Sequence, residues 1–179
     1  MSKNGSEKIL KSIAEMKAGV FIDDSNLYHA CKKNGWRVDL LKLKKLLEGL
    51  CNLQFINYYV GIPEKNDSAY KGTEKFLNKI KKSITIKAKK LKYIPARKSI
   101  IKKADVDVEI TLDVVRNVDD LELIIIISGD SDFHELKNYT IKDKGKNIIF
   151  IAFRKNMAWE LRNCWHLFID DYQDNLKCA

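Results

Sequence analysis

Short apolar runs alternate with amphipathic segments along the chain. The apolar runs are rich in β-branched and aromatic residues and have the length of buried strands; they cover residues 18–23, 53–62, 121–128, 147–153 and 167–169. The segments between them repeat apolar residues with helical spacing; they cover residues 25–33, 39–49, 63–81 (after a turn at Pro63), 105–117, 131–144 and 156–164. Because strands that alternate with helices form a parallel sheet with helices on both faces, the pattern predicts a three-layer α/β domain with a central, mainly parallel sheet.

Two parts of the chain depart from this alternation. Residues 83–94 alternate apolar and basic side chains, which predicts a half-exposed strand or hairpin with lysine on its outer face, and residues 95–99 are expected to form a loop. Residues 1–15 are expected to form an N-terminal extension, helical or frayed. The folded domain is expected to cover residues 16–172, followed by a C-terminal tail at residues 173–179.

The composition fits one soluble, folded domain. Hydrophobic residues make up 45% of the 179 positions and there are only 2 prolines, which excludes a disordered chain. No apolar run approaches the roughly 20 residues that cross a bilayer, and the N-terminus lacks the apolar core of a signal peptide. The 4 cysteines form no C-x-x-C pair and the 3 histidines complete no zinc-ligand spacing, so free thiols are expected. We therefore expect a cytoplasmic protein with no membrane partner.

The basic charge is concentrated in one segment. Between residues 65 and 103 there are 14 Lys or Arg residues and two acids, so the net charge of this segment is +12. The net charge of the whole chain is +9, so the rest of the chain has a net charge of −3. A concentrated positive charge attracts polyanions by releasing their counterions, which makes nucleic acid the expected partner. A solvated, lysine-rich surface has the same composition, so charge alone does not separate the two interpretations.

Acidic residues follow two of the predicted strands at the point where each strand ends. Asp23 and Asp24 end the first strand, and residues 128–132 (Ser-Gly-Asp-Ser-Asp) end the third. Ligands of parallel sheets bind beyond the carboxyl ends of the strands, and neighbouring strands lie about 4.8 Å apart, so these acids converge if the two strands are neighbours. A third acidic group opens the helix predicted at residues 105–117; it consists of Asp105, Asp107, Glu109 and Asp113.

Each acidic motif taken alone has a simpler explanation as a helix N-cap, because Asp, Ser and Asn after a strand accept hydrogen bonds from the first turn of a helix. Asp132 and Glu135 even have the spacing of an acidic capping box. Both motifs together at strand ends, with a third acidic group available, favour a ligand site instead. Crowded carboxylates repel each other, and a divalent cation removes that penalty. Carboxylates without Cys or His favour Mg²⁺ or Mn²⁺.

Three motifs resemble the NYN domains, chiefly their LabA-like branch. They are residues 20–27 (VFIDDSNL), residues 103–108 (KADVDV) and residues 128–133 (SGDSDF), of which the last is the most specific. The resemblance extends over roughly residues 17–171. It implies a PIN-like, Rossmann-like fold and the activity of PIN nucleases, which depend on Mg²⁺ or Mn²⁺ and mostly cut RNA. The expected function is therefore that of a metal-dependent ribonuclease, more specifically an endoribonuclease, with RNA as its partner.

Carried over by position, the resemblance assigns four carboxylates to metal binding and catalysis, and one amide to catalysis. The carboxylates are Asp23, Asp107, Asp130 and Asp132, and the amide is Asn26, which would orient a metal-bound water or a phosphate oxygen. Asp105 is an alternative to Asp107, because the motif reads Ala-Asp-Val-Asp where relatives commonly read Gly-Val-Asp. Asp24 stands where many relatives have Gly, so it either adds a charge near the metal or turns outward.

Two further residues, Asp113 and Ser128, are expected to support the ligands without binding the metal. Asp113 follows Asp107 by six residues on the same predicted helix, about 240° further round, so the two do not share a metal. The predicted RNA contacts are Lys98, Lys102, Lys103 and Arg154. By analogy with PIN nucleases, cleavage would leave 3′-hydroxyl and 5′-phosphate ends.

Alternative interpretations exist for single residues and for the whole chain. Trp36 and Tyr93 could stack on bases but are expected to pack in the fold, and His134 is expected to be an ordinary helix residue. A non-catalytic RNA-binding module of the same fold would keep the basic segment and dispense with the aspartates. A phosphatase or phosphotransfer domain also has an acid after its first strand, but Ser25 stands where a dehalogenase-like phosphatase needs a second Asp. The oligomeric state stays open.

Overall fold

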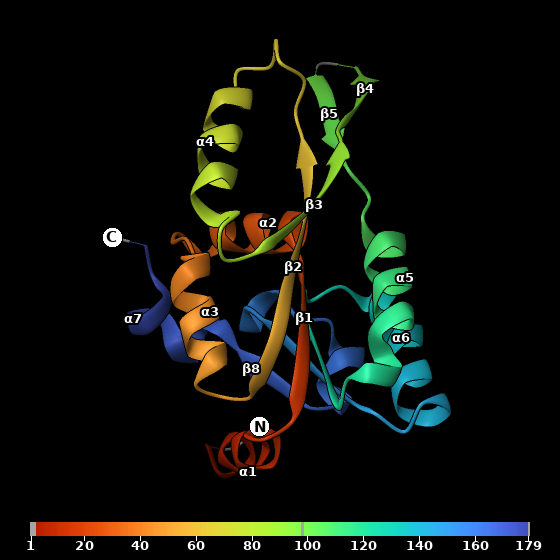
Figure 1. Ribbon diagram of the computed structural model, residues 1–179. Coiled ribbons are helices and arrows are strands. Elements are labelled where there is room, and N and C mark those ends of the chain that lie inside the picture. Colours follow the sequence, from red (N-terminus) through yellow and green to blue (C-terminus); the bar gives the residue numbers. More distant parts are fainter. Residues whose placement is uncertain (1–2, 98, 179) are drawn as a thin grey trace.

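The computed structural model describes residues 3–97 and 99–178 and contains one six-stranded sheet in which every pairing is parallel (Figure 1). Its strands are β1 (Lys17–Asp23), β2 (Asn52–Ile62), β3 (Thr85–Lys90), β6 (Leu123–Ile127), β7 (Asn147–Ala152) and β8 (His166–Phe168). They lie in the order β3-β2-β1-β6-β7-β8. From β1 the chain continues outward to β2 and β3, and from β6 outward to β7 and β8, so the strand order reverses between β1 and β6.

The central position of β1 and β6 follows from their side chains. Every residue of β6 is buried, and every residue of β1 except Lys17 is buried. A strand whose two faces are both covered must be apolar on both, which is why these two runs show no alternation.

Helices cover both faces of the sheet. On one face lie α1 (Lys3–Ile13), α2 (Asp24–Asn34), α3 (Leu40–Glu48), α4 (Tyr70–Ile80) and α7 (Gln173–Leu176); on the other lie α5 (Asp107–Asn117) and α6 (His134–Asn138). The shorter elements are the 3₁₀ turns η1 (Val118–Asp120), η2 (Ser131–Phe133), η4 (Arg154–Asn156), η5 (Trp159–Asn163) and η6 (Ile169–Tyr172), and the π-helical turn η3 (Tyr139–Asp143). Among the described residues, no helix is long and apolar enough to cross a membrane.

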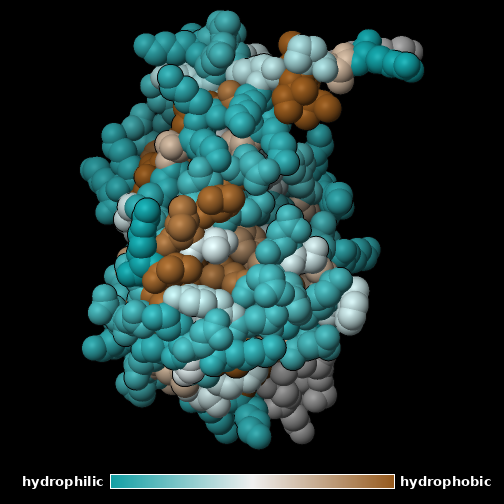
Figure 2. All heavy atoms as spheres, turned by 90° about the vertical axis from the view of Figure 1, so that its right-hand side faces the viewer, coloured by the Kyte–Doolittle hydropathy of each residue, from teal (hydrophilic) through white to brown (hydrophobic). Residues whose placement is uncertain are grey.

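A separate two-stranded hairpin, formed by the antiparallel strands β4 (Lys92–Ala96) and β5 (Ser99–Lys103), projects beyond the sheet (Figure 1). The two residues that flank the hairpin, Leu91 and Ala104, pack against β2 at Gly61. A Cβ added to Gly61 would lie 2.5 Å from the Leu91 side chain and 2.8 Å from that of Ala104. A glycine is therefore required for the hairpin to sit against the sheet. In the view of Figure 2 the hairpin extends from the top of the body and carries hydrophobic surface.

The predicted α/β class with a central parallel sheet and helices on both faces is confirmed. Of the strand or hairpin expected within residues 83–94, the structure has the strand, because β3 is a single edge strand paired with β2; the hairpin lies further on, where β4 pairs with β5. Two other elements need correction. Pro95 and Ala96, expected in a loop, pair with β5. The helix expected after Pro63 begins only at Tyr70, because the side chain of Asp67 accepts a hydrogen bond from the N–H of Ala69 and holds a turn there.

The helices predicted after β6 and β7 are less regular than expected. The segment 131–144 is divided into the 3₁₀ turn η2, the short helix α6 and the π-helical turn η3. In η3 the hydroxyl of Thr140 donates to the carbonyl of Leu136 at 2.8 Å. Such a bond competes with the regular ladder and widens the turn. The segment 156–164 forms 3₁₀ turns only.

Candidate functional site

Asp23, the last residue of β1, stands where the strand order reverses and is only 4% exposed. Its Oδ1 atom accepts a hydrogen bond from the backbone N–H of Asn26 at 3.1 Å and so caps the start of α2. Its Oδ2 atom accepts a hydrogen bond from the hydroxyl of Ser128, on the loop after β6, at 3.2 Å. One carboxylate therefore begins a helix and also ties the ends of the two central strands together.

The loop after β6 is held by further hydrogen bonds. The hydroxyl of Ser128 accepts from the N–H of Asp130 at 3.2 Å, and Asp130 Oδ1 accepts from the N–H of Asp132 at 3.1 Å, which caps η2. The side-chain oxygen of Asn26 accepts from the N–H of Gly129 at 3.0 Å. This bond joins α2 to the loop after β6, and the role expected of Asn26, to orient a water or a phosphate, stays a prediction.

Gly129 has a steric role that sequence reasoning missed. A Cβ at this position would lie 2.2 Å from the backbone oxygen of Asn156, and the Gly129 carbonyl accepts a hydrogen bond from the N–H of Ala158 at 2.9 Å. The Asn156 side chain in turn accepts from the amide of Asn34 at 3.1 Å. Nothing in the sequence points to Asn156, because its contacts exist only after β7 has been placed beside β6.

Asp107, the first residue of α5, is half-buried. Its pKa is raised to about 7, first by burial and then by a hydrogen bond with Asp105. The negative charges of Asp23, Asp105 and Asp130 also contribute to this rise. The pKa of Asp23 is also raised, first by burial and then by the charge of Asp130, although its hydrogen bonds oppose the shift. The structure therefore brings Asp23, Asp107 and Asp130 close enough to repel one another, and we call these three the aspartate cluster.

Asp105 and Asp132 are exposed at the margin of the aspartate cluster. Lys103 forms an ion pair with Asp105 at 2.9 Å, and hydrogen bonds from Lys103 and Asp107 hold the pKa of Asp105 low. The pKa of Lys103 is raised chiefly by Asp105 and, to a smaller extent, by the charges of Asp107 and Asp132. Of the two candidates in the middle motif, Asp107 therefore faces the other carboxylates and Asp105 faces a lysine.

The aspartate cluster has the donor chemistry of a site for a hard divalent cation, since it offers carboxylate oxygens without Cys or His. Within residues 3–97 and 99–178, no three His, Cys, Asp or Glu side chains converge closely enough to form a ready-made metal centre. The repulsion that raises the pKa values of Asp23 and Asp107 is, however, the penalty that a bound cation removes. The residues present fit Mg²⁺ or Mn²⁺ in chemistry and in charge.

Asp24 turns away from the aspartate cluster. Its carboxylate accepts a hydrogen bond from the hydroxyl of Tyr58, whose ring belongs to the core under α2, α3 and α4. Burial raises the pKa of Asp24 to about 6, and the hydrogen bond from Tyr58 limits the shift. The extra acid at this position therefore joins α2 to β2.

Asp113 also lies apart from Asp107, on another side of α5. It accepts a hydrogen bond from the hydroxyl of Tyr59 at 2.8 Å and forms ion pairs with Lys87 at 3.3 Å and Arg116 at 3.2 Å. Burial opposes ionisation of Asp113, but the Tyr59 hydrogen bond and the Lys87 charge outweigh it and lower the pKa. Asp113 therefore connects α5 to β2 and β3.

Of the three lysines predicted to contact RNA, Lys102 and Lys103 are engaged within the fold. Lys102 forms an ion pair with Asp67 at 2.6 Å, and the hydroxyl of Tyr93 donates to the same carboxylate at 2.8 Å. These bonds fix the hairpin to the loop before α4. Lys103 pairs with Asp105, as described above, and Lys98 lies outside the described residues.

Arg154, the fourth predicted contact, is engaged in a similar way. It forms an ion pair with Asp171 at 2.6 Å and lies over the ring of Phe168, 3.9 Å from its centroid. Trp36 lies in the core, 8% exposed, with its ring 5.0 Å from that of Phe153.

Comparisons with known proteins agree with the geometry. Residues 17–173 match the family model described as "NYN domain", which confirms the resemblance seen in the motifs. The Low amplitude and bright protein LabA of Synechococcus elongatus is 26% identical over 159 residues, which cover 86% of this chain and 83% of that protein. A Vibrio parahaemolyticus protein of unknown function has the same fold, with a TM-score of 0.72, 22% identity and coverage of 91% of this chain and 96% of that one.

Proposed function

Because the chain belongs to the NYN domain family, we propose that it is a metal-dependent ribonuclease, and specifically an endoribonuclease, that hydrolyses RNA phosphodiester bonds at the aspartate cluster. The observation that supports this proposal is that the charges of Asp23 and Asp130 act on Asp107 near the reversal of strand order. Open parallel sheets bind their ligands at this position. NYN domains generally act on RNA, which gives the substrate class.

The three carboxylates of the aspartate cluster would hold Mg²⁺ or Mn²⁺, with Asp132 available at the margin. A bound divalent ion supplies two effects at such a site, a more acidic water and neutralisation of charge that develops on the phosphate. Asp23 keeps its carboxylate fixed through its bonds to Asn26 and Ser128. Asn26 keeps the loop that carries Asp130 in register with α2. These residues pre-position the ligands, so that little reorganisation is needed when substrate binds.

The proposal is tested with labelled single-stranded RNA, incubated with the protein and Mg²⁺ or Mn²⁺, with and without EDTA. Asp130→Asn keeps the size of the side chain and removes its charge, so cleavage should fall by at least about 100-fold if the charge holds the metal. Asp143→Asn is the matched control, since Asp143 is exposed on η3. Cleavage by Asp130→Asn at the wild-type rate, or in excess EDTA, would contradict the proposal.

A second function has one observation in its favour, the absence of a ready-made metal centre among the described residues. The chain would then bind RNA through its basic surface without cutting it. Under this alternative, RNA binding persists in EDTA and in Asp130→Asn, and intact RNA is recovered from every incubation. The cleavage assay above therefore separates the two functions directly.

A further inference from the structure

The outward face of α4 carries a row of three lysines, Lys71, Lys75 and Lys79, all of them exposed. Their spacing of four residues puts them on one face of the helix, over about 12 Å of its length. Leu77 and Ile80 lie on the opposite side and pack against the sheet. We call the three residues the lysine row.

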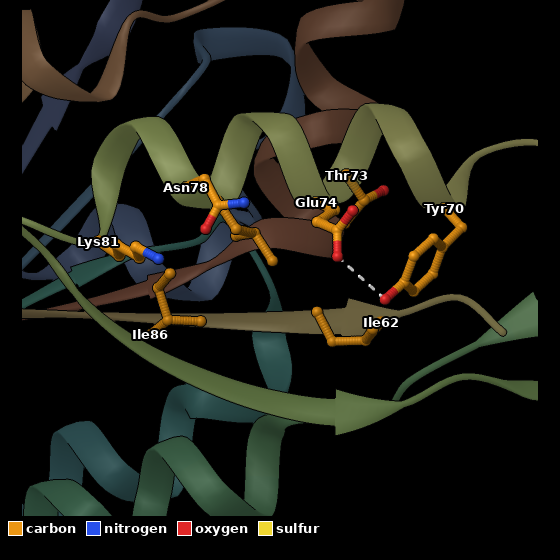
Figure 3. Close-up of a pocket in the computed structure, with 8 residues that line it drawn as sticks. Ile62, Tyr70, Thr73, Glu74, Asn78, Lys81 and Ile86 are labelled. Carbon is orange, nitrogen blue, oxygen red and sulfur yellow. Dashed lines mark hydrogen bonds between the residues drawn. The ribbon is translucent and has the colours of Figure 1, made fainter. Parts of the chain in front are cut away.

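Within the described part of the chain, the lysine row lacks acidic partners, in contrast to four other lysines of the 65–103 segment. Four lysines of β3 and the hairpin pair with carboxylates; these are Lys87, Lys89, Lys102 and Lys103. No carboxylate of the described residues lies within 4.0 Å of a lysine of the row. Glu74, the acid of α4, accepts a hydrogen bond at 3.2 Å from Tyr70, one turn earlier on the same helix, and both side chains line a groove between α4 and the strands β2 and β3 (Figure 3).

An uncompensated lysine row destabilises the helix that carries it. Like charges four residues apart repel, whereas a Glu at one of these positions would have stabilised the helix. A bound polyanion relieves the repulsion and releases its own counterions. The row therefore has the electrostatics of a polyanion-binding surface, while the paired lysines of the hairpin hold the fold together.

Side-chain contacts connect α4 to the start of α2, the helix that Asp23 caps. The ring of Phe76, on the flank of the lysine row, lies 6.0 Å from the ring of Tyr58. Tyr58 donates its hydroxyl to Asp24, the neighbour of Asp23. In Figure 1 the start of α4 extends beyond the carboxyl end of the sheet, beside β3 and the hairpin. A strand held along α4 is thus held at the end of the molecule that contains the aspartate cluster.

We propose that the lysine row binds the phosphate backbone of single-stranded RNA next to the aspartate cluster, an inference that rests on the proposed function. Lysine ammonium groups contact phosphates as point charges, so binding should be independent of base sequence. A phosphate backbone fits better than an anionic membrane, because a membrane-binding helix exposes an apolar face beside its lysines. In α4 the apolar side chains Leu77 and Ile80 face the core, and Phe76, although 38% exposed, is a single ring that packs against Tyr58.

The test compares two triple variants with the same loss of charge. One is Lys71→Gln, Lys75→Gln and Lys79→Gln; the other is Lys8→Gln, Lys11→Gln and Lys45→Gln, on α1 and α3, where these lysines are exposed. Fluorescence anisotropy with labelled single-stranded RNA in EDTA measures binding without cleavage. We expect the first variant to bind at least about tenfold more weakly and the second within about twofold of wild type. Each lysine–phosphate contact contributes about 0.7 to the salt slope, so the slope should fall by about 2 in the first variant only.

Parallel measurements separate this inference from the proposed function. If the lysine-row variant binds RNA like wild type with an unchanged salt slope, the inference is wrong even where cleavage with Mn²⁺ is observed. If binding falls as expected and no protein cuts RNA, the inference stands and the nuclease proposal fails. Wild-type protein that binds vesicles of anionic phospholipid and not RNA, or neither, would also overturn the inference. Circular dichroism checks that both variants fold, and relief of repulsion predicts that the lysine-row variant melts no lower than wild type.

Discussion

The carboxyl group of Asp107 is held in the folded chain with a pKa near 7, whereas its ordinary value is 3.8. Between these two values the folded protein binds a proton that the unfolded chain does not bind. Its contribution to stability is therefore present at low pH and is lost as pH rises through about 7. A divalent cation bound beside Asp107 would relieve this unfavourable charge.

Replacing Asp107 by Asn removes that charge and keeps the size of the side chain. In EDTA at pH 8 we expect Asp107→Asn to melt at a higher temperature than wild type, with the difference shrinking toward pH 5, where the wild-type group is protonated. Thermal unfolding at both pH values checks this, with Asp143→Asn as control. A variant that melts at or below the wild-type temperature at pH 8 would show that Asp107 is not under electrostatic strain.

Gly129 is the residue at which the motif after β6 is most constrained by space. Its added Cβ would lie 2.2 Å from a backbone oxygen, which cannot move away as a flexible side chain could. We expect Gly129→Ala to lower the free energy of unfolding by about 1–3 kcal/mol. Gly72→Ala is the matched control, because nothing lies within 4 Å of its added Cβ on α4, and alanine should stabilise that helix by up to about 1 kcal/mol. Urea unfolding of both variants measures the difference, and equal midpoints would exclude the steric role.

At the scale of elements, the strands were predictable because their apolar runs are buried on both faces. The hairpin was not, since β5 begins beyond the expected loop and the hairpin depends on Gly61 and on Asp67, far from it in sequence. The helix 131–144 was predicted with the wrong regularity, because apolar spacing does not distinguish an α-helix from a π-helical turn. Hydrogen bonds and ion pairs determine where the hairpin lies and how regular the helices are. These contacts form between elements that come together only in the folded chain.

The attachment of the hairpin through Asp67 gives a prediction at this scale. Hydrogen bonds from Lys102, Ala69 and Tyr93 lower the pKa of Asp67 to about 2, so the attachment holds above pH 4 and is lost as pH falls through about 2. At neutral pH, Asp67→Asn should loosen the hairpin with little change in global melting temperature. Hydrogen exchange of the hairpin amides, followed by mass spectrometry, should become at least about tenfold faster than in wild type or Asp143→Asn. Unchanged exchange would show that Asp67 does not hold the hairpin.

At the scale of the whole molecule, the candidate site depends on the order of the strands. The sequence places acids at two strand ends, but only the pairing of β1 with β6 makes Asp23 a neighbour of Asp130. The position of Asp107 depends further on how α5 lies across the sheet, which no periodicity reveals. Three of the predicted RNA contacts have acidic partners in the fold: Lys102 and Arg154 pair with acids distant in the sequence, and Lys103 pairs with the nearby Asp105.

Isothermal titration of the RNA-free protein with Mn²⁺ at pH 7.5 measures whether the aspartate cluster binds a metal. We expect saturable binding by wild type and by Asp143→Asn. Binding by Asp23→Asn, Asp107→Asn and Asp130→Asn should be at least about tenfold weaker, since each variant loses one carboxylate of the aspartate cluster. Equal Mn²⁺ affinity in wild type and in all three cluster variants would contradict a metal site at this position.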